Sequence, residues 1–201
     1  MRVWIAAACY LACGEDTAMQ CIYRWQPVDG PGLEHLILRQ GDNMIVADGV
    51  VVGSDDDDGP FGCSYRICCN ADWLVRSVEA NVAGGGLIVL TTDGDGHWRD
   101  GDGHALPQLD GCIDVDISAT PFTNTLPIRR LSTQLAQRAE LCIAWIRIPA
   151  LEVHRAPQAY TWLHDGRYRF EALATGFEAV LEVDANGLVL DYPALFRRVE
   201  T

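Results

Sequence analysis

The stretch that decides the fold class reads FEAVLEVDANGLVL and covers residues 177–190. Between Phe177 and Val183, apolar residues at every second position alternate mainly with Glu, which is the period of a strand with one buried face. Asn186 and Gly187 follow, and an Asn-Gly pair supplies the positive φ angles of a type I′ turn. Residues 188–190 are apolar again. The sequence therefore predicts a β-hairpin here.

The same pattern of short apolar strands and Gly, Asp or Asn turns recurs along most of the chain. A second hairpin is predicted around Asp165-Gly166. Further strands are expected at residues 33–38, 44–52, 65–69, 73–82, 87–91 and 141–148. Only residues 131–139 could form two or three helical turns, and two strands could equally occupy that window. We therefore expect a mainly β protein with a large antiparallel curved sheet or barrel-like fold and few or no helices.

An internal duplication into two related halves is left open by one recurrence. Tyr65-Arg66 is followed by an aromatic residue, an apolar strand and a Gly-rich turn, and Tyr168-Arg169 is followed by the same succession. Antiparallel hairpins look alike by default, so the recurrence indicates a shared pattern more than a shared origin.

Composition excludes several classes of function. The chain has 201 residues and a net charge of −13, and all 15 basic residues are Arg. Without Lys there is no Schiff-base chemistry and no Walker-type phosphate lysine. An acidic protein is also a poor partner for the phosphate backbone, so no nucleic-acid partner is expected. The length suits a single domain with a sizeable core.

Residues 1–18 imitate a short signal peptide, because one Arg precedes about ten apolar residues. The segment is too short to span a bilayer, and no transmembrane segment is expected elsewhere. We expect residues 1–18 to be an extension, with Met19 as the natural start of one domain over residues 19–201 and a cytoplasmic location. The alternative is an exported lipoprotein anchored at Cys13.

No metal or cofactor is expected. The eight Cys are interpreted as buried, inert thiols. A zinc site from Cys63, Cys68 and either His97 or His104 is the alternative, although no ligand pair has a finger-like spacing. The Asp-rich runs at 55–58, 93–97 and 100–104 are interpreted as solvated turns, since no Glu closes an EF-hand loop.

The most distinctive stretch is GCIDVDISATPFTNTLPIRRL, residues 111–131. Asp114 and Asp116 share one face of a predicted strand, a loop bounded by Pro121 and Pro127 follows, and Arg129 and Arg130 come after it. Two carboxylates and two guanidiniums can form a bidentate ion-pair network. That network either shapes the loop or, together with Asn124, offers hydrogen bonds to a polar ligand group.

An enzyme is the alternative reading of the same stretch. No G-x-S-x-G elbow, G-x-G-x-x-G helix start or H-E-x-x-H motif occurs. Asp114 or Asp116 could still serve as the base of a hydrolase or isomerase acting on a lipid-linked or sugar substrate. Such a role requires a strongly raised carboxylate pKa in a cleft.

Aromatic residues are the second group that could contribute to a binding site. In a strand, each of them most often belongs to the sheet core. Together they could instead line an apolar cavity inside a curved sheet. They are Trp25, Trp73, Trp98, Trp145, Trp162, Tyr65, Tyr160, Tyr168 and Tyr192.

With these residues in view, the chain resembles the glycolipid-binding family of small bacterial and fungal proteins. The block at 111–131 is the most specific part of the resemblance, which extends from Trp25 to Val199. Supporting positions occur on both sides of the block. They are Gly32, Glu34, Tyr65, Asp72, Trp73, Arg76, Gly96, Trp98, Gln158, Tyr160, Tyr168, Phe177, Asp184, Gly187, Asp191, Tyr192 and Pro193.

The resemblance implies a curved antiparallel sheet, similar in shape to lipoprotein carriers, that binds a glycolipid or similar amphiphile without catalysis. Apolar inward positions would take the alkyl chains, and a polar mouth of Asp and Arg would bind the head group. The oligomeric state stays open. The residues expected to contact the ligand are Trp25, Glu34, Tyr65, Trp73, Arg76, Trp98, Asp114, Asp116, Asn124, Arg129, Arg130, Tyr160 and Tyr192.

Overall fold

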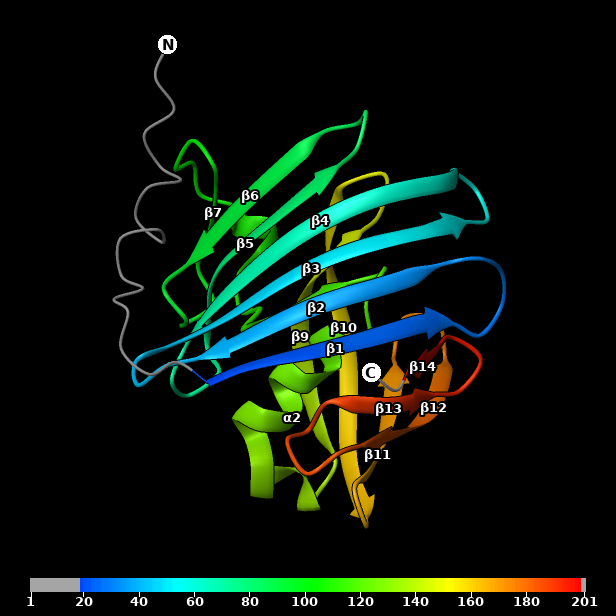
Figure 1. Cartoon of the computed structure of the whole chain (residues 1–201). Coiled ribbons are helices and arrows are strands. Elements are labelled where there is room, and N and C mark those ends of the chain that lie inside the picture. The colour runs from blue at the N-terminus through cyan, green and yellow to red at the C-terminus, as the bar shows by residue number, and fades with distance from the viewer. Residues whose placement is uncertain (1–18, 200–201) are drawn as a thin grey trace.

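The computed structural model describes residues 19–199, in which 14 strands form one continuous sheet. The sheet is strongly curved and wraps around the helical segments (Figure 1). The prediction of a mainly β protein with a large curved sheet is confirmed. The sheet is not closed, because its strand order runs from β7 at one edge to β8 at the other. The predictions for residues 1–18 lie outside the described residues.

The strands are β1 (Met19–Pro27), β2 (Leu33–Gln40), β3 (Met44–Asp55), β4 (Gly59–Asn70), β5 (Val75–Val82), β6 (Leu87–Thr92), β7 (Trp98–Asp100), β8 (Asp114–Ile117), β9 (Ala139–Arg147), β10 (Glu152–His164), β11 (Arg167–Ala172), β12 (Phe177–Val183), β13 (Val189–Tyr192) and β14 (Phe196–Arg198). The helical segments are η1 (Pro107–Leu109), η2 (Phe122–Asn124), α2 (Thr125–Leu131) and η3 (Ser132–Ala136).

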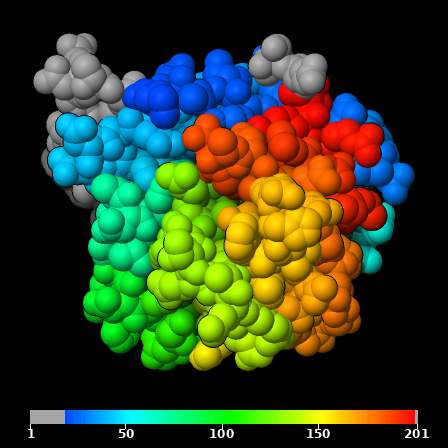
Figure 2. Space-filling model, turned by 90° about the horizontal axis from the view of Figure 1, so that it is seen from below, coloured from blue at the N-terminus to red at the C-terminus, as the bar shows by residue number. Residues whose placement is uncertain are grey.

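Neighbours in sequence are neighbours in the sheet except for β7 and β8, which form its two edges, and two pairings shape the molecule. First, β1 pairs with β14, Trp25 opposite Arg198, so the two ends of the described chain meet in the middle of the sheet. Figure 2 shows the red C-terminal segment lying against the blue N-terminal strands. Second, β8 pairs with β9 in parallel, so the expected antiparallel sheet has one parallel pair at its edge. A parallel pair needs a long crossover, and residues 118–138 supply it.

That crossover contains the helix, which begins earlier than expected. The sequence predicts helical turns over 131–139, and the 3-10 helix η3 lies in that window, but the α-helix α2 covers Thr125–Leu131 and strand β9 already begins at Ala139. Pro127 was taken as the end of a loop. It lies instead in the first turn of α2, where the missing N–H of proline costs no hydrogen bond. Ser132, with a φ of 45°, ends the helix.

The curved sheet encloses two packed cores. One lies between strands β1–β7 and the segment from Leu109 to Leu126. The other lies between strands β9–β13 and the residues of α2 and η3, with Leu135 and Tyr160 at its centre. In Figure 2 the crossover, drawn in yellow-green, fills the space between the two parts of the sheet. In the part of the chain that the structure describes, no helix is long and apolar enough to cross a membrane.

A glycine in β3 makes room for one buried tyrosine. Gly49 lies opposite Tyr65 in the β3–β4 register, and the Tyr65 ring occupies the space that a side chain at position 49 would need. The ring therefore crosses over β3, and its hydroxyl reaches Glu34 on β2. The backbone φ of Gly49 lies outside the left-handed region, so an unusual backbone conformation is not the reason for glycine here. The reason is the close approach of the Tyr65 ring.

We expect Gly49→Ala to destabilise the protein by about 2 kcal/mol, because a methyl group would collide with the Tyr65 ring. The measurement is urea unfolding followed by tryptophan fluorescence. Gly62→Ala on the adjacent strand is the matched control, since its new Cβ would lie 3.7 Å from the Ala83 Cβ, an ordinary contact. Equal stability of the two variants would contradict the argument.

Candidate functional site

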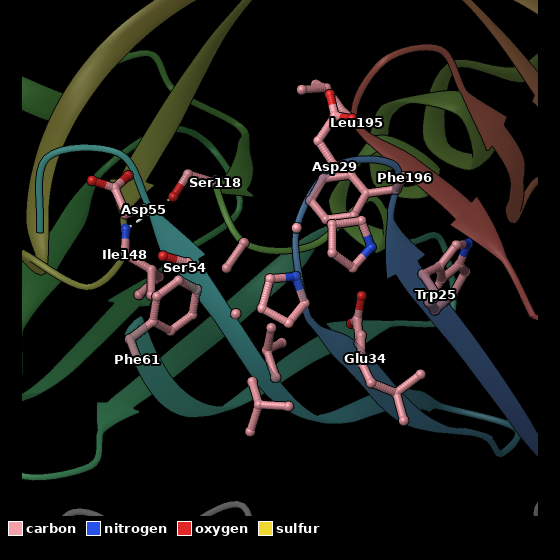
Figure 3. A pocket seen from close by; sticks show the side chains of 18 of the residues that line it. Trp25, Asp29, Glu34, Ser54, Asp55, Phe61, Ser118, Ile148, Leu195 and Phe196 are labelled. Atoms are coloured by element: carbon pink, nitrogen blue, oxygen red, sulfur yellow. Dashed lines mark hydrogen bonds between the residues drawn. The ribbon is translucent and has the colours of Figure 1, made fainter. Parts of the chain in front are cut away.

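A pocket of about 350 Å³ lies where the ends of several strands meet. Its walls come from segments far apart in sequence, including β1, β2, β3 and the chain before and within β14 (Figure 3). The lining residues are Trp25, Pro27, Asp29, Gly30, Pro31, Leu33, Glu34, Val51, Val52, Gly53, Ser54, Asp55, Asp56, Phe61, Ser118, Ala119, Ile148, Ala194, Leu195 and Phe196. The pocket thus combines apolar walls with carboxylate and hydroxyl groups, and the two kinds of surface line it in similar amounts.

Glu34 is the most unusual of these residues, because its carboxylate is only half satisfied. It is 2% exposed, and its Oε1 accepts hydrogen bonds from the Tyr65 hydroxyl at 2.5 Å and the Thr120 hydroxyl at 2.7 Å. Oε2 is buried without a partner. Figure 3 shows the carboxylate pointing from β2 toward Phe196. A buried polar atom without a partner is costly and marks a place where a ligand group would be favourable.

Burial also changes the acidity of this site. Loss of hydration raises the pKa of Glu34 to about 7, although the hydrogen bonds from Tyr65 and Thr120 lower it. Burial, together with the neighbouring Glu34 charge, raises the pKa of Tyr65 well above its usual value. The Glu34 carboxyl can therefore gain or lose a proton near neutral pH.

An acidic turn borders the pocket. Asp55 and Asp56 belong to both the lining and the Asp-rich run at 55–58. The guanidinium of Arg147 holds this turn, with ion pairs of 3.2 Å to Asp55, 3.0 Å to Asp57 and 2.9 Å to Asp58. The run is therefore not only a solvated turn, as expected, but is tied to the end of β9. The runs at 93–97 and 100–104 are closed by hydrogen bonds from backbone N–H groups to their first Asp.

The two predicted carboxylates of the central block lie outside this pocket and are fully engaged. Asp114 on β8 forms a two-pronged ion pair with Arg130 on α2, at 2.6 Å and 3.0 Å. Asp116 accepts hydrogen bonds from Thr123 at 2.7 Å and Gln158 at 2.8 Å. Burial raises the pKa of both carboxyls, and their partners lower it. Both side chains thus connect β8 to the crossover and to β10.

The same network continues to the other polar candidates in the block. The Tyr160 hydroxyl donates to the Asn124 side-chain oxygen at 2.9 Å, and the Asn124 amide donates to the Pro121 carbonyl. Thr120, four residues before Asn124, donates to Glu34. The block therefore holds the Glu34 carboxylate in place through Thr120. Of the block's residues, only Ser118 and Ala119 line the pocket itself.

The remaining expected residues are spread over the molecule. Trp25 lines the pocket and donates its indole N–H to the Val189 carbonyl at 2.8 Å. The Trp98 indole donates to the Cys112 carbonyl inside the core. Arg76 donates to the Asp93 carbonyl of an exposed loop. Tyr192 packs among phenylalanines in the second core. The structure thus brings Trp25, Glu34 and Tyr65 together and keeps the others apart from them.

Arg129 borders a second hollow, of about 440 Å³, on the far side of the crossover. Its guanidinium lies 5.2 Å from the centroid of the Trp73 ring. Trp162, which is 44% exposed, and Tyr168 line this hollow together with Ser132. The roles of Trp73 and Arg129 as ligand contacts stay predictions.

The pocket residues that the sequence did not indicate come from both turns and strands. Pro31 and Ser118 lie in turns, Phe61 in β4 and Phe196 in β14, and strand pairing brings these segments together. The pairing of Pro27 with Phe196 brings the C-terminal strand to the pocket, and no local pattern predicts that pairing. In the sequence, the Pro- and Gly-rich turn after β1, residues 28–32, is the local pattern that indicates an unusual backbone conformation at the pocket.

No metal centre is built into the part of the chain that the structure describes. Residues 19–199 contain no group of three or more His, Cys, Asp or Glu side chains arranged to hold an ion. Six cysteines of that range are free thiols, including Cys112 and Cys142, whose sulfur atoms lie 3.3 Å apart. The polar side chains that line the Glu34 pocket carry carboxylates and hydroxyls.

Comparisons with known proteins point to one family. The family model described as "Putative glycolipid-binding" matches residues 22–198. A crystal structure of a DUF1089 family protein from Pseudomonas aeruginosa is similar to this chain, with 42% identity and a TM-score of 0.76. The similarity covers 87% of this chain and 95% of that one. A comparison with curated proteins found no match.

The raised pKa of Glu34 predicts a stability that falls as pH rises. Between pH 4.5 and about 7 the folded protein holds a proton that the unfolded chain has released, so folding is favoured at low pH and loses about 3 kcal/mol on the way to pH 8. Urea unfolding at pH 5 and pH 8 measures this loss. Glu34→Gln should remove most of it, whereas Glu178→Gln on exposed β12 should not. The same pH dependence in the Glu34→Gln variant would contradict the assignment.

Arg130→Met should destabilise the protein by about 3 kcal/mol or more, because it leaves the Asp114 carboxylate buried without its partner. Adding Asp114→Asn to that variant should restore part of the loss, and a double-mutant cycle from urea unfolding measures the coupling. Arg138→Met is the control, since Arg138 pairs with Glu140 and Glu171 at the surface and its loss should matter much less. If the changes in unfolding free energy at positions 114 and 130 were additive, they would contradict a direct interaction between Asp114 and Arg130.

Proposed function

The chain belongs to the glycolipid-binding family, and from that premise we propose that the Glu34 pocket binds a glycolipid or similar amphiphile without converting it chemically. The polar head enters the pocket and meets the Glu34 carboxylate, while the apolar part of the ligand contacts the surrounding side chains. The observation that carries this proposal is the unpartnered Oε2 of Glu34 inside a pocket with apolar walls.

The size of the pocket indicates which part of an amphiphile it accepts. A volume of about 350 Å³ is at the lower end for small-molecule sites. It suits a head group with the first carbons of a chain and not a complete glycolipid. The rest of the chain would lie along the mouth of the pocket.

Exposed apolar side chains at that mouth support this arrangement. Leu33, Val52 and Leu195 line the pocket, and each is between 40% and 55% exposed. Covering such groups with an alkyl chain contributes roughly 0.8 kcal/mol per buried CH₂. In this proposal Trp25 and Tyr65 position the pocket wall and the carboxylate, and Asp114, Asp116, Asn124, Arg130 and Tyr160 hold the crossover behind it.

A second candidate function is acid–base catalysis by Glu34. A buried carboxyl with a pKa of about 7 in a pocket is what a hydrolase or isomerase uses to move a proton. In that case Glu34, and not Asp114 or Asp116, is the catalytic residue, because the two aspartates lie outside the pocket lining. Release of sugar from an alkyl glycoside, lost in Glu34→Gln, would favour this candidate over simple binding.

Native mass spectrometry with n-octyl β-glucoside below its micellar concentration tests the binding proposal. We expect a one-to-one adduct and a higher melting temperature. Val52→Gln should weaken binding by about 1 kcal/mol, or roughly fivefold in Kd, because it removes apolar contact at the pocket mouth.

Val50→Gln is the matched control for that variant. Val50 lies two residues earlier on the same face of β3, is 56% exposed against 55% for Val52, and is not part of the pocket lining. It should leave the affinity unchanged. The absence of an adduct and of any thermal stabilisation, with octyl glucoside and with a bacterial lipid extract, would reject the proposed function.

A further inference from the structure

We infer that the Glu34 pocket selects amphiphiles whose head group carries an ammonium cation, over those with a neutral or an anionic head. This inference rests on the proposed function, since it names the class of ligand for the same pocket. It follows from three features of the lining: its charge, the direction of its hydrogen bonds and its aromatic faces.

The charge of the lining has one sign. Glu34 lies inside, and Asp29, Asp55 and Asp56 surround the opening, while the lining includes no Arg or His. Because the Glu34 carboxylate is 2% exposed, water screens it little, and its attraction for a nearby cation is stronger than that of a surface acid. A sulfate or phosphate head would be repelled by these carboxylates, although less by Asp55, whose charge Arg147 partly neutralises.

Basic groups near the pocket are already engaged with other acids. Arg147 is paired with Asp55, Asp57 and Asp58, so it neutralises part of the rim without joining the lining. Arg198 lies 5.3 Å from the Trp25 ring centroid and pairs with Asp184 through one nitrogen, while its Nε and Nη2 are buried without a hydrogen-bond partner. Neither arginine is part of the pocket lining.

The polar groups of the pocket accept hydrogen bonds more than they donate. Oε2 of Glu34 is an unpartnered acceptor, and the carboxylates of Asp29, Asp55 and Asp56 are acceptors as well. The Ser118 hydroxyl accepts a hydrogen bond from the Ile148 N–H at 2.9 Å, so its own proton can still be donated. The carboxylate acceptors of the pocket nevertheless outnumber this donor. An ammonium group has three donors and no acceptor, so it complements this set better than a sugar hydroxyl does.

Aromatic side chains complete the complementarity. Phe61 and Phe196 form part of the pocket wall, and Figure 3 shows both of them with Glu34 around the same pocket. The face of an aromatic ring attracts a cation within about 6 Å. A cationic head between Glu34 and Phe196 would therefore be favoured on two sides.

Three probes with the same octyl chain test the inference: n-octylammonium, n-octyl β-glucoside and n-octyl sulfate, each titrated calorimetrically below its micellar concentration at pH 8 and low salt. We expect octylammonium to bind at least tenfold more tightly than the glucoside, and the sulfate most weakly. The preference should shrink toward pH 6, where Glu34 gains a proton while an alkylammonium stays charged. Tyr65, Thr120 and Cys63 lie close to the same carboxyl, and the rim aspartates line the same pocket, so the glucoside titration at both pH values corrects for their effects.

Variants separate the inference from the proposed function. Glu34→Gln should reduce the ratio of the ammonium affinity to the glucoside affinity to about threefold or less. Asp29→Asn at the rim should reduce it partly, and Asp42→Asn, in an exposed turn outside the pocket, should not. Equal affinity for the three probes, or tightest binding of the sulfate, would overturn the inference and leave the proposed function standing. No binding of any probe would overturn both.

Discussion

The ion pair between Asp114 and Arg130 is the interaction on which the two parts of this protein depend. Asp114 belongs to β8, which packs on the first core, and Arg130 belongs to α2, which covers the second. A carboxylate that is completely buried needs such a partner, since the cost of removing it from water is several kcal/mol. Because the pair fixes α2 against β8, it also fixes the crossover between them, including Thr120, which reaches the pocket.

Three buried carboxylates illustrate how stability and binding are divided. Asp114 and Asp116 have partners for both oxygens and serve the fold. Glu34 has partners for one oxygen only, although Tyr65 is brought to it across a glycine of β3. The unpartnered Oε2 of Glu34 lowers the stability of the folded protein. In return, the pocket has a hydrogen-bond acceptor that is shielded from water and therefore interacts strongly with a donor. The contrast supports assigning function to Glu34 and structure to the aspartates.

Local patterns in the sequence were sufficient for the fold class but not for the arrangement of its elements. The Asn186-Gly187 turn and the alternation before it predicted a hairpin that the structure contains. The predicted helical window contains η3, but the start of α2 has no such signal, because Pro127 indicates a loop although proline is well tolerated in a first helical turn. Trp25, Glu34 and Tyr65 were expected near the ligand and do lie together, but the pocket wall from Leu195 and Phe196 depends on long-range pairing that has no local signature.

The pairing of the first strand with the last has a consequence for synthesis on the ribosome. Strand β1 is an unpaired edge toward β14 until residues 196–198 have been made, so the growing chain exposes Trp25 and an open row of backbone groups throughout its production. Contacts between chain ends are also the slowest to form. The nascent protein therefore carries a template for mispairing with its neighbours, and the pairing of β14 with β1 both covers this edge and completes the pocket wall.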